Sequence, residues 1–352
     1  MMIREYLQSI AEAKRKGIAA GIISGILLPF SWFYAGCVSL LAGLRSFRRK
    51  KLPCVVISVG NITWGGTGKT PLVEFIALFL KNNGRSPAVL SRGYGGSGKL
   101  AAGDEPLMLQ HRLQGIPVLT DKKRERSCIK AVKEFFADTV ILDDGFQQWG
   151  IKKDLEIVAV DALNPFGNGR IIPAGMLREP LFALKRADIF LLTRCERAGD
   201  IAPLKRKLAQ INPRAGLLAC RHSVSGFFPA AGVTSSMLDA RAFSGSEVTV
   251  FSGIAVPESF EEGVRATGAH ITAAYRFPDH YLYGRREIDG IIARSAGQGC
   301  RALITTEKDA ARLFVLYDGK PPAELWVMRI ELEFEGDDAE RLRDRLLGVY
   351  LS

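Results

Sequence analysis

The sequence lacks any spacing of cysteines that would hold a metal ion or a disulfide framework. Its six cysteines are scattered over 352 residues, and none belongs to a C-x-x-C pair. Zinc-binding modules and small secreted domains both depend on closely spaced cysteines, so neither class fits this chain. We therefore expect a protein of a reducing compartment.

Internal repeats and long low-complexity segments are also missing, and only four residues are histidine. With 47% hydrophobic and 24% charged residues, the composition is that of a globular protein and not of a disordered one. A chain of 352 residues is long enough for roughly two domains.

Acidic residues are outnumbered by basic residues, and the net charge is +11. Such an excess indicates an anionic partner, which could be nucleic acid, anionic lipid or a phosphorylated substrate. Basic clusters at residues 14–16 and 45–51 flank an apolar segment, and this position favours a membrane surface over nucleic acid.

The apolar segment, residues 17–44, contains no charged residue over 28 positions. Its length is that of a transmembrane helix candidate and exceeds the apolar region of a signal peptide. Pro29 and several small residues leave three possibilities open. The favoured one is a hairpin or interfacial helix pair broken at Pro29; a single span and an apolar helix packed on the protein are the others.

Residues 55–83 have the pattern of a phosphate-binding loop. A β-branched run, Val55–Val59, predicts a buried strand, a glycine-rich turn follows, and residues 70–83 are expected to form a helix. Backbone N–H groups of residues 66–69 would point into one concavity at the positive end of that helix. The pattern favours a nucleoside triphosphate site.

Within this loop, Lys69 is expected to reach the β- and γ-phosphates, and the Thr70 hydroxyl is expected to ligate Mg²⁺. The strict pattern has glycine where Thr63 stands, so the alternative is a glycine-rich turn with a chance lysine. The residues predicted to bind the nucleotide are Thr63, Trp64, Gly65, Gly66, Thr67, Gly68, Lys69 and Thr70.

A second acidic element follows a buried run at residues 139–142. Asp143 and Asp144 precede Gly145, and carboxylates at the end of a strand downstream of a phosphate loop are typical of a Walker B element that binds Mg²⁺. The alternative is an ordinary turn, because Asp-Gly is a common turn pair.

Asp104 and Glu105 stand at an expected helix start. Asp104 could cap that helix or could accept the proton of an attacking hydroxyl, and spacing alone does not separate the two. His280 follows Asp279 in an expected loop; a lone histidine is more often structural, although an aspartate neighbour can tune a base.

Two more motifs have a structural and a functional interpretation. Arg178 could brace a phosphate by a bidentate contact or pair with Glu179. Thr306 and Asp309 have the spacing of a capped helix start, and we interpret them first as structure.

Strands alternating with helices predict a parallel α/β sheet. The expected domains are a membrane-associated segment at 1–51, a phosphate-loop core at 52–225 and a smaller α/β domain at 226–352.

One family shows the same set of motifs in the same order over about residues 55–310. The motifs are 60–71, 91–95, 103–106, 143–147, 173–180, 251–255, 277–280 and 306–309. In these segments the chain resembles the tetraacyldisaccharide 4′-kinases, the lipid A 4′-kinases of Gram-negative bacteria. Thr63 belongs to that family's form of the phosphate loop.

The resemblance implies a P-loop NTPase-like parallel sheet flanked by helices, with a second, smaller α/β domain and an apolar N-terminal helix. It implies transfer of the ATP γ-phosphoryl group, with Mg²⁺, to the 4′-hydroxyl of a tetraacylated glucosamine disaccharide 1-phosphate. The expected place is the cytoplasmic face of the inner membrane of a Gram-negative bacterium. We expect a monomer with no nucleic-acid partner.

By the same resemblance, Asp104 matches the catalytic carboxylate, His280 its partner, and Asp143 and Asp144 lie near Mg²⁺. Further candidates for contacts with substrate or phosphate are Glu105, Arg124, Gln147 and Arg178.

The chain departs from the family at Gln148, where histidine is common, and at Met176, where proline is common. Two alternatives stay open: a kinase for another membrane-surface sugar or lipid, and a membrane-tethered NTPase switch.

Overall fold

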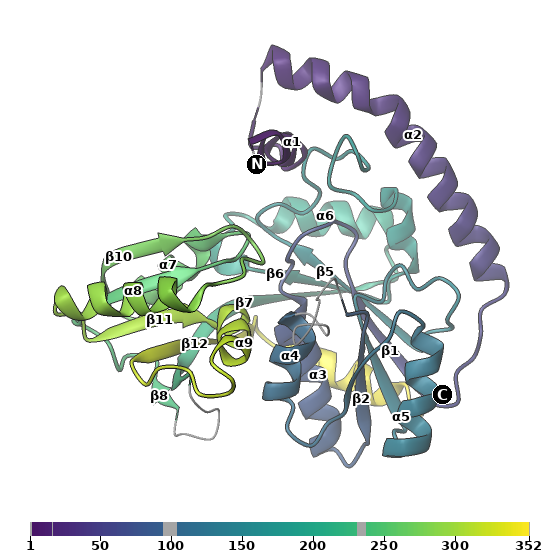
Figure 1. The fold of residues 1–352 in the computed structure, drawn as a ribbon. Helices are drawn as coiled ribbons and strands as arrows, with labels where there is room; N and C mark the ends of the chain where they lie inside the picture. Colours follow the sequence, from purple (N-terminus) through teal and green to yellow (C-terminus); the bar gives the residue numbers. More distant parts are fainter. Residues whose placement is uncertain (1, 16, 94–103, 231–236, 352) are drawn as a thin grey trace. The chain divides into compact units, whose positions relative to one another are not determined.

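The computed structural model describes residues 2–15, 17–93, 104–230 and 237–351. The chain forms two compact units (Figure 1). We call them the core unit, which comprises Met1–Leu90, Lys123–Arg221 and Phe334–Ser352, and the second unit, which comprises Ser91–Lys122 and His222–Glu333.

The core unit contains a parallel sheet with the strand order β7-β6-β5-β1-β4-β2. In chain order these strands are β1 (Val55–Gly60), β2 (Pro87–Ser91), β4 (Thr139–Asp143), β5 (Leu155–Asp161), β6 (Ile189–Thr193) and β7 (Gly216–Pro229). Every residue of β2, β4 and β6 is buried, as expected for strands covered on both faces. The predicted fold class is confirmed.

Helices surround this sheet, with 3₁₀ turns near β6. They are α1 (Met2–Ala11), α2 (Ile18–Phe47), α3 (Lys69–Asn82), α5 (Arg124–Phe135), η2 (Leu181–Arg186), η3 (Cys195–Arg197), α6 (Ala202–Ile211) and α10 (Asp338–Gly348).

The second unit repeats the α/β pattern with the parallel order β10-β9-β11-β12. Its elements are α4 (Asp104–Arg112), β3 (Val118–Thr120), β8 (Leu238–Asp239), β9 (Glu247–Ser252), α7 (Pro257–Ala266), β10 (His270–Arg276), α8 (Arg285–Gly297), β11 (Ala302–Thr306), α9 (Glu307–Leu316) and β12 (Leu325–Phe334).

Both compact units are discontinuous in sequence, unlike the expected domains 52–225 and 226–352. The chain end returns to the core unit, where the ring of Phe334 lies 4.9 Å from that of Phe75 on α3. The segment Ser91–Lys122 belongs to the second unit, where the ring of His111 on α4 lies 4.9 Å from that of Phe314 on α9. Side-chain packing between distant segments therefore sets the boundaries.

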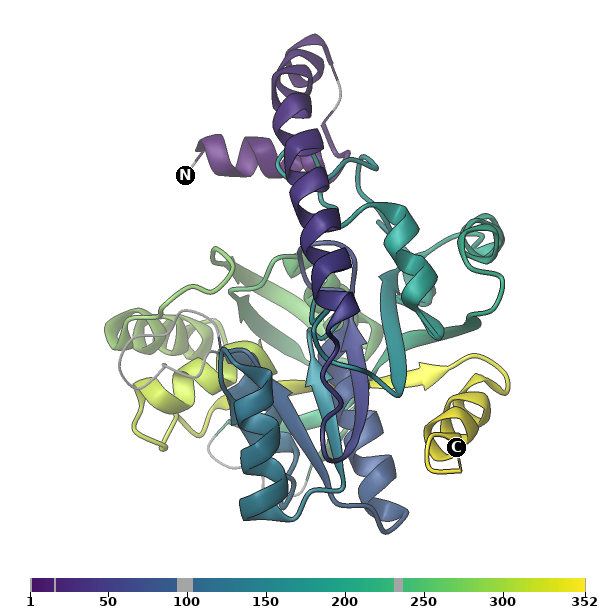
Figure 2. The same cartoon turned by 90° about the vertical axis from the view of Figure 1, so that its right-hand side faces the viewer.

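The apolar N-terminal segment forms one uninterrupted helix, α2, with Pro29 inside it (Figure 2). The favoured helix pair broken at Pro29 was therefore wrong. Only 17% of the most apolar window of α2 is buried, which also disfavours a helix packed on the protein. Its buried residues form a narrow stripe of Ala20, Ser24, Ser31 and Val38. By length and composition, α2 could cross a membrane.

A glycine at the end of β1 lets that strand approach the loop after β4. A Cβ atom on Gly60 would lie 2.5 Å from the backbone nitrogen of Phe146, too close for any real contact. Because both partners belong to the fully buried core, we expect Gly60→Ala to destabilise the protein by about 1–3 kcal/mol. Urea unfolding measures this loss. Gly150→Ala is the matched control, since no described atom lies within 4 Å of its Cβ; equal midpoints for the two variants would contradict the argument.

Candidate active site

The predicted strand, turn and helix of the phosphate-binding loop are all present in the core unit. Strand β1 ends at Gly60 and α3 begins at Lys69, with Thr70 as its second residue. Gly65 and Gly68 have φ angles of 106° and 72°, in the left-handed region that favours glycine. The loop therefore has the backbone that its glycines predict.

Thr193, the last residue of β6, and Arg194, which follows it, hold this loop through its carbonyl groups. The Thr193 hydroxyl donates to the Thr67 carbonyl at 3.0 Å, and Arg194 Nη2 donates to the Gly66 carbonyl at 2.8 Å. Arg194 also pairs with Asp161 at the end of β5. Sequence reasoning missed both braces, because they lie more than 120 residues beyond the loop.

The start of the loop lies against residues 176–178. The main-chain N–H of Trp64 donates to the Met176 carbonyl at 2.9 Å, and the main-chain N–H of Arg178 donates to the Ile62 carbonyl at 2.8 Å. Thr63 is buried and forms an isolated antiparallel β-bridge with Leu177. The contact at Met176 uses its main-chain carbonyl, which proline also has, so this departure from the family leaves that hydrogen bond available.

Asp144 lies between two cations. Its Oδ1 is 3.4 Å from Lys69 Nζ, and Arg178 Nη1 donates to its two carboxylate oxygens at 2.9 and 2.8 Å. Lys69 Nζ also donates to Asn61 Oδ1 at 3.0 Å. Burial by itself would raise the pKa of Asp144, but Lys69 and Arg178 outweigh it and hold the pKa below its ordinary value. The site thus keeps an ionised carboxylate beside the loop lysine.

Asp143, the last residue of β4, is almost fully buried. Its main-chain carbonyl accepts a hydrogen bond from Arg124 Nη2 at 2.8 Å. Asp144 has a φ of 54°, so the chain does turn here. The Walker B and turn interpretations are therefore compatible, and Arg124 braces the turn from α5.

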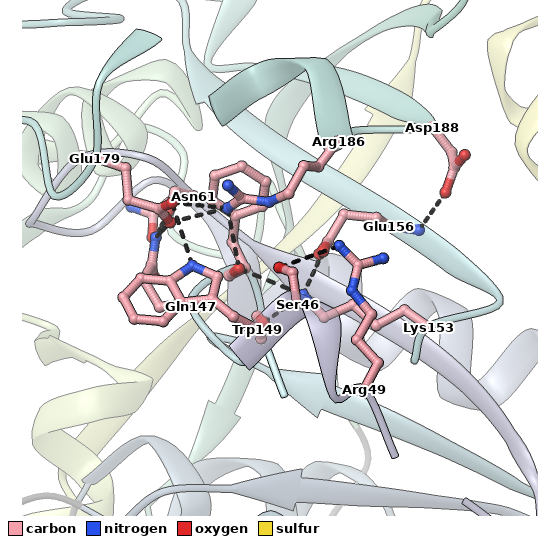
Figure 3. A network of polar contacts seen from close by, with 12 residues as sticks. Ser46, Arg49, Asn61, Gln147, Trp149, Lys153, Glu156, Glu179, Arg186 and Asp188 are labelled. Carbon is pink, nitrogen blue, oxygen red and sulfur yellow. Dashed lines mark hydrogen bonds and ion pairs between the residues drawn. The ribbon is translucent and has the colours of Figure 1, made fainter. Parts of the chain in front are cut away.

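Glu179 is the buried centre of a polar network (Figure 3). It accepts hydrogen bonds from Gln147 Nε2 at 3.1 Å, Trp149 Nε1 at 3.2 Å and Arg186 Nη2 at 2.9 Å. The suggested Arg178–Glu179 pair was wrong, since Arg178 binds Asp144 and Glu179 binds Arg186.

Gln147 links this network to the phosphate loop. Its Nε2 donates to the Asn61 carbonyl at 3.2 Å, and its Oε1 accepts from Arg178 Nη1 at 3.2 Å. Gln148 is half-buried and its N–H donates to the Gly145 carbonyl at 2.9 Å. Gln147 therefore positions Arg178 and Asn61.

In the second unit, Asp309 is fully buried and organises a cluster that includes Arg312 and Tyr283. It accepts hydrogen bonds from the Thr306 hydroxyl at 2.6 Å, the Tyr283 hydroxyl at 2.8 Å and Arg312 Nη1 at 2.9 Å. Asp309 N–H donates to Thr306 Oγ1, which confirms the predicted helix cap. Burial and the Asp309 carboxylate raise the pKa of Tyr283.

His280 lies at the exposed edge of this cluster. Its side chain is 63% exposed, with Nε2 3.7 Å from Asp279 Oδ2 and Nδ1 3.4 Å from Arg312 Nη2. The main-chain N–H of His280 donates to the Gly253 carbonyl at 3.2 Å, and the residue has a φ of 61°. The imidazole is accessible to solvent, as a group that acts on a substrate must be. Arg312, its neighbour, was not identified from the sequence.

Asp104 is the first residue of α4, at the expected helix start. The side chains of Asp104 and Glu105 lie outside the described residues, as does the rest of the motif before them. The capping and proton-accepting roles of Asp104, and its partnership with His280, stay predictions.

Mg²⁺ is compatible with the residues of the core unit. Among the described residues, no group of three or more His, Cys, Asp and Glu could by itself hold a metal ion. Mg²⁺ bound with a nucleotide needs only one or two carboxylates, since phosphates and water complete its shell. Asp144, kept ionised near α3, and the Thr70 hydroxyl supply donors of the right kind.

Comparisons with known proteins agree on one family. Residues 23–349 match the family described as tetraacyldisaccharide-1-P 4′-kinase. A tetraacyldisaccharide 4′-kinase of Syntrophobacter fumaroxidans is 40% identical, covering 97% of this chain and 91% of the relative. One of Pelobacter propionicus is 37% identical, covering 88% and 89%. The "apo" form of LpxK from Aquifex aeolicus, in complex with ATP, has a similar structure: the TM-score is 0.73 at 25% identity, covering 93% of this chain and 99% of that one.

Proposed function

The chain belongs to the tetraacyldisaccharide-1-P 4′-kinase family, and we infer that it transfers the γ-phosphoryl group of ATP to the 4′-hydroxyl of a tetraacylated glucosamine disaccharide 1-phosphate. The product is the 4′-phosphorylated lipid A precursor, lipid IVA. The observation that carries this proposal is the contact of Lys69 with Asp144 at the start of α3. It supports the proposal because Lys69 would bind phosphate and Asp144 would bind Mg²⁺, and the two side chains lie 3.4 Å apart.

The reaction follows from these groups. The acceptor oxygen attacks the γ-phosphorus, the bond to the β-phosphate oxygen breaks, and ADP leaves. Lys69 and the loop N–H groups stabilise charge on the phosphate oxygens, and Arg178 keeps Asp144 ionised. Thr70, Asp143 and Asp144 would hold Mg²⁺, which neutralises charge on the phosphates. Asp104 would take the proton of the 4′-hydroxyl, with His280 as its partner.

Incubation with radiolabelled ATP and a lipid disaccharide 1-phosphate tests the proposal. We expect a doubly phosphorylated lipid and ATP consumption that depends on the acceptor. No product across several acyl patterns would contradict the proposed substrate. Slow ATP hydrolysis without any acceptor would support a membrane-tethered switch instead.

Arg178→Gln tests the role given to Asp144. Removing the guanidinium leaves the burial of Asp144 in place, so its pKa rises and the carboxylate takes up a proton at higher pH. We expect kcat/KM to fall by about 10- to 100-fold and the acidic limb of its pH profile to move to higher pH. Arg126→Gln, at an exposed position on α5, is the control. An unshifted acidic limb in the Arg178 variant would rule out this role.

We also propose that α2 binds the cytoplasmic face of the inner membrane, where ATP is present. Large apolar side chains on α2 are exposed, among them Ile26 at 63% and Phe33 at 76%. A 30-residue helix is about 45 Å long, which exceeds a hydrocarbon core of about 30 Å. The basic clusters at its two ends would face lipid phosphates.

Sedimentation with anionic lipid vesicles measures this binding. We expect the double variant Ile26→Asp and Phe33→Asp to leave the vesicle fraction, since each buried carboxylate costs about 2.5–3.5 kcal/mol at a helix centre. Phe182→Asp is a control on η2, where the side chain is 60% exposed. Unchanged sedimentation of the double variant would place the contact elsewhere.

A further inference from the structure

Two thiols far apart in sequence meet beside the strand that leads to the phosphate loop. Cys54 directly precedes β1 and Cys128 lies in the first half of α5, 74 residues later. Their sulfur atoms are 3.5 Å apart and share a hydrogen bond. Both residues belong to the core unit. This pair has no part in the proposed phosphoryl transfer.

The two thiols differ in access and in acidity. Cys54 is half-buried, whereas Cys128 is fully buried. The hydrogen bond from Cys54 lowers the pKa of Cys128, and the same bond, together with burial, raises the pKa of Cys54. A reagent from solvent therefore reaches the Cys54 sulfur first, whereas Cys128, the thiol with the lowered pKa, is buried behind it.

Another pair of buried cysteines in the core unit lacks these properties. Cys195 and Cys220 both donate to the Leu192 carbonyl, at 3.6 and 3.4 Å, and not to each other. Burial raises the pKa of Cys195 to about 11 and that of Cys220 further. Both stay protonated and unreactive at neutral pH.

We propose that Cys54 and Cys128 form a redox-sensitive modification site, which a small-molecule disulfide such as oxidised glutathione converts reversibly into an intrachain disulfide. The Cys128 thiolate takes the proton of Cys54 through their hydrogen bond as the Cys54 sulfur attacks the reagent, so that a mixed disulfide forms and one thiolate leaves. That thiolate takes the proton back from Cys128, whose sulfur then attacks the Cys54 sulfur and displaces the second thiolate, which is protonated by solvent. The two cysteines are oxidised, the reagent is reduced to two thiols, and the protons of the cysteines pass to them.

The geometry requires little movement. A disulfide bond is about 2 Å long, so a small side-chain rotation from 3.5 Å brings the sulfur atoms together. Transient disulfides of this kind are those that occur in reducing compartments. The link would join the start of β1 to α5 and close a chain loop that contains the whole phosphate-binding loop.

The test uses the full-length protein, incubated with oxidised glutathione and then digested without reductant. We expect one linked peptide pair, containing Cys54 and Cys128, which dithiothreitol separates. Because the link restricts the unfolded chain, the unfolding temperature should rise by about 5 °C and return on reduction. Neither readout depends on kinase activity, so failure here and failure of the proposed function are distinguishable.

Matched variants make the outcome specific. Cys54→Ser and Cys128→Ala should each abolish both the linked peptide and the temperature shift, whereas Cys37→Ser, at an exposed position on α2, should preserve them. A mixed disulfide with glutathione that never resolves would overturn the proposal. Linkage through any other cysteine, or no reaction at all, would overturn it too.

Discussion

Lys69→Met is expected to lower kcat for phosphoryl transfer by about 10²- to 10³-fold, the loss found when one preorganised donor to a charged transition state is removed. Lys69 is the cation that both contacts Asp144 and stands at the start of α3. Its loss removes charge stabilisation from the phosphates. It also removes one of the two cations that keep the pKa of Asp144 low.

Steady-state kinetics at saturating ATP and lipid measure this effect. Lys69→Arg is the matched control, since it keeps the positive charge and should retain part of the activity. The Met variant should unfold at a similar urea concentration, because Lys69 lies at a helix end and not in the apolar core. If Lys69→Met kept activity near that of the natural protein, the loop lysine would have no role in the mechanism.

Asp104→Asn is expected to lower kcat by about 10²- to 10⁴-fold, the usual contribution of a positioned general base. The amide cannot take the proton of the acceptor hydroxyl. ATP binding should be nearly unchanged, because the residues predicted to bind the nucleotide lie on the loop before α3. Equilibrium binding of a fluorescent ATP analogue and single-turnover transfer separate the two effects.

The proposed partnership with His280 adds a sharper test. If Asp104 and His280 act as a unit, the double variant Asp104→Asn with His280→Asn should be little slower than Asp104→Asn alone. Multiplied losses would show that the two residues act independently. A normal rate in Asp104→Asn would show that another group accepts the proton.

Local patterns predicted the elements of the site well. The strand, turn and helix at residues 55–83 follow from a β-branched run, glycines and an amphipathic stretch that are adjacent in sequence. The cap at Thr306 was predictable for the same reason, since its acceptor and donor are three residues apart. Such features depend on short-range geometry, which a single sequence contains.

Contacts between distant segments were not predictable from these patterns. The sequence suggested Glu179 as the ion-pair partner of Arg178. Residues 176–178 instead lie along the phosphate loop, and this brings Arg178 to Asp144. Arg194 and Arg312 were missed because each donates to a carbonyl group from a distant segment, that of Gly66 for Arg194 and that of Gly253 for Arg312. Strand order and side-chain packing decide these pairs.

The expectation that the apolar helix breaks at Pro29 was wrong for a different reason. Proline inside a helix removes one hydrogen bond and usually ends or kinks it. Over 30 residues, the many remaining hydrogen bonds outweigh that single loss, and the helix continues through Pro29.

The buried contact of α2 with the segment at residues 173–178 has a consequence for where catalysis can happen. Ser31 on α2 accepts a hydrogen bond from Ala174 N–H at 3.0 Å, and four residues later Arg178 binds Asp144. The short segment at residues 174–178 therefore connects α2 directly to Asp144 beside the phosphate loop. With α2 at a bilayer, the height of the γ-phosphate above the lipid is set by the protein, and the acceptor sugar must come to that height.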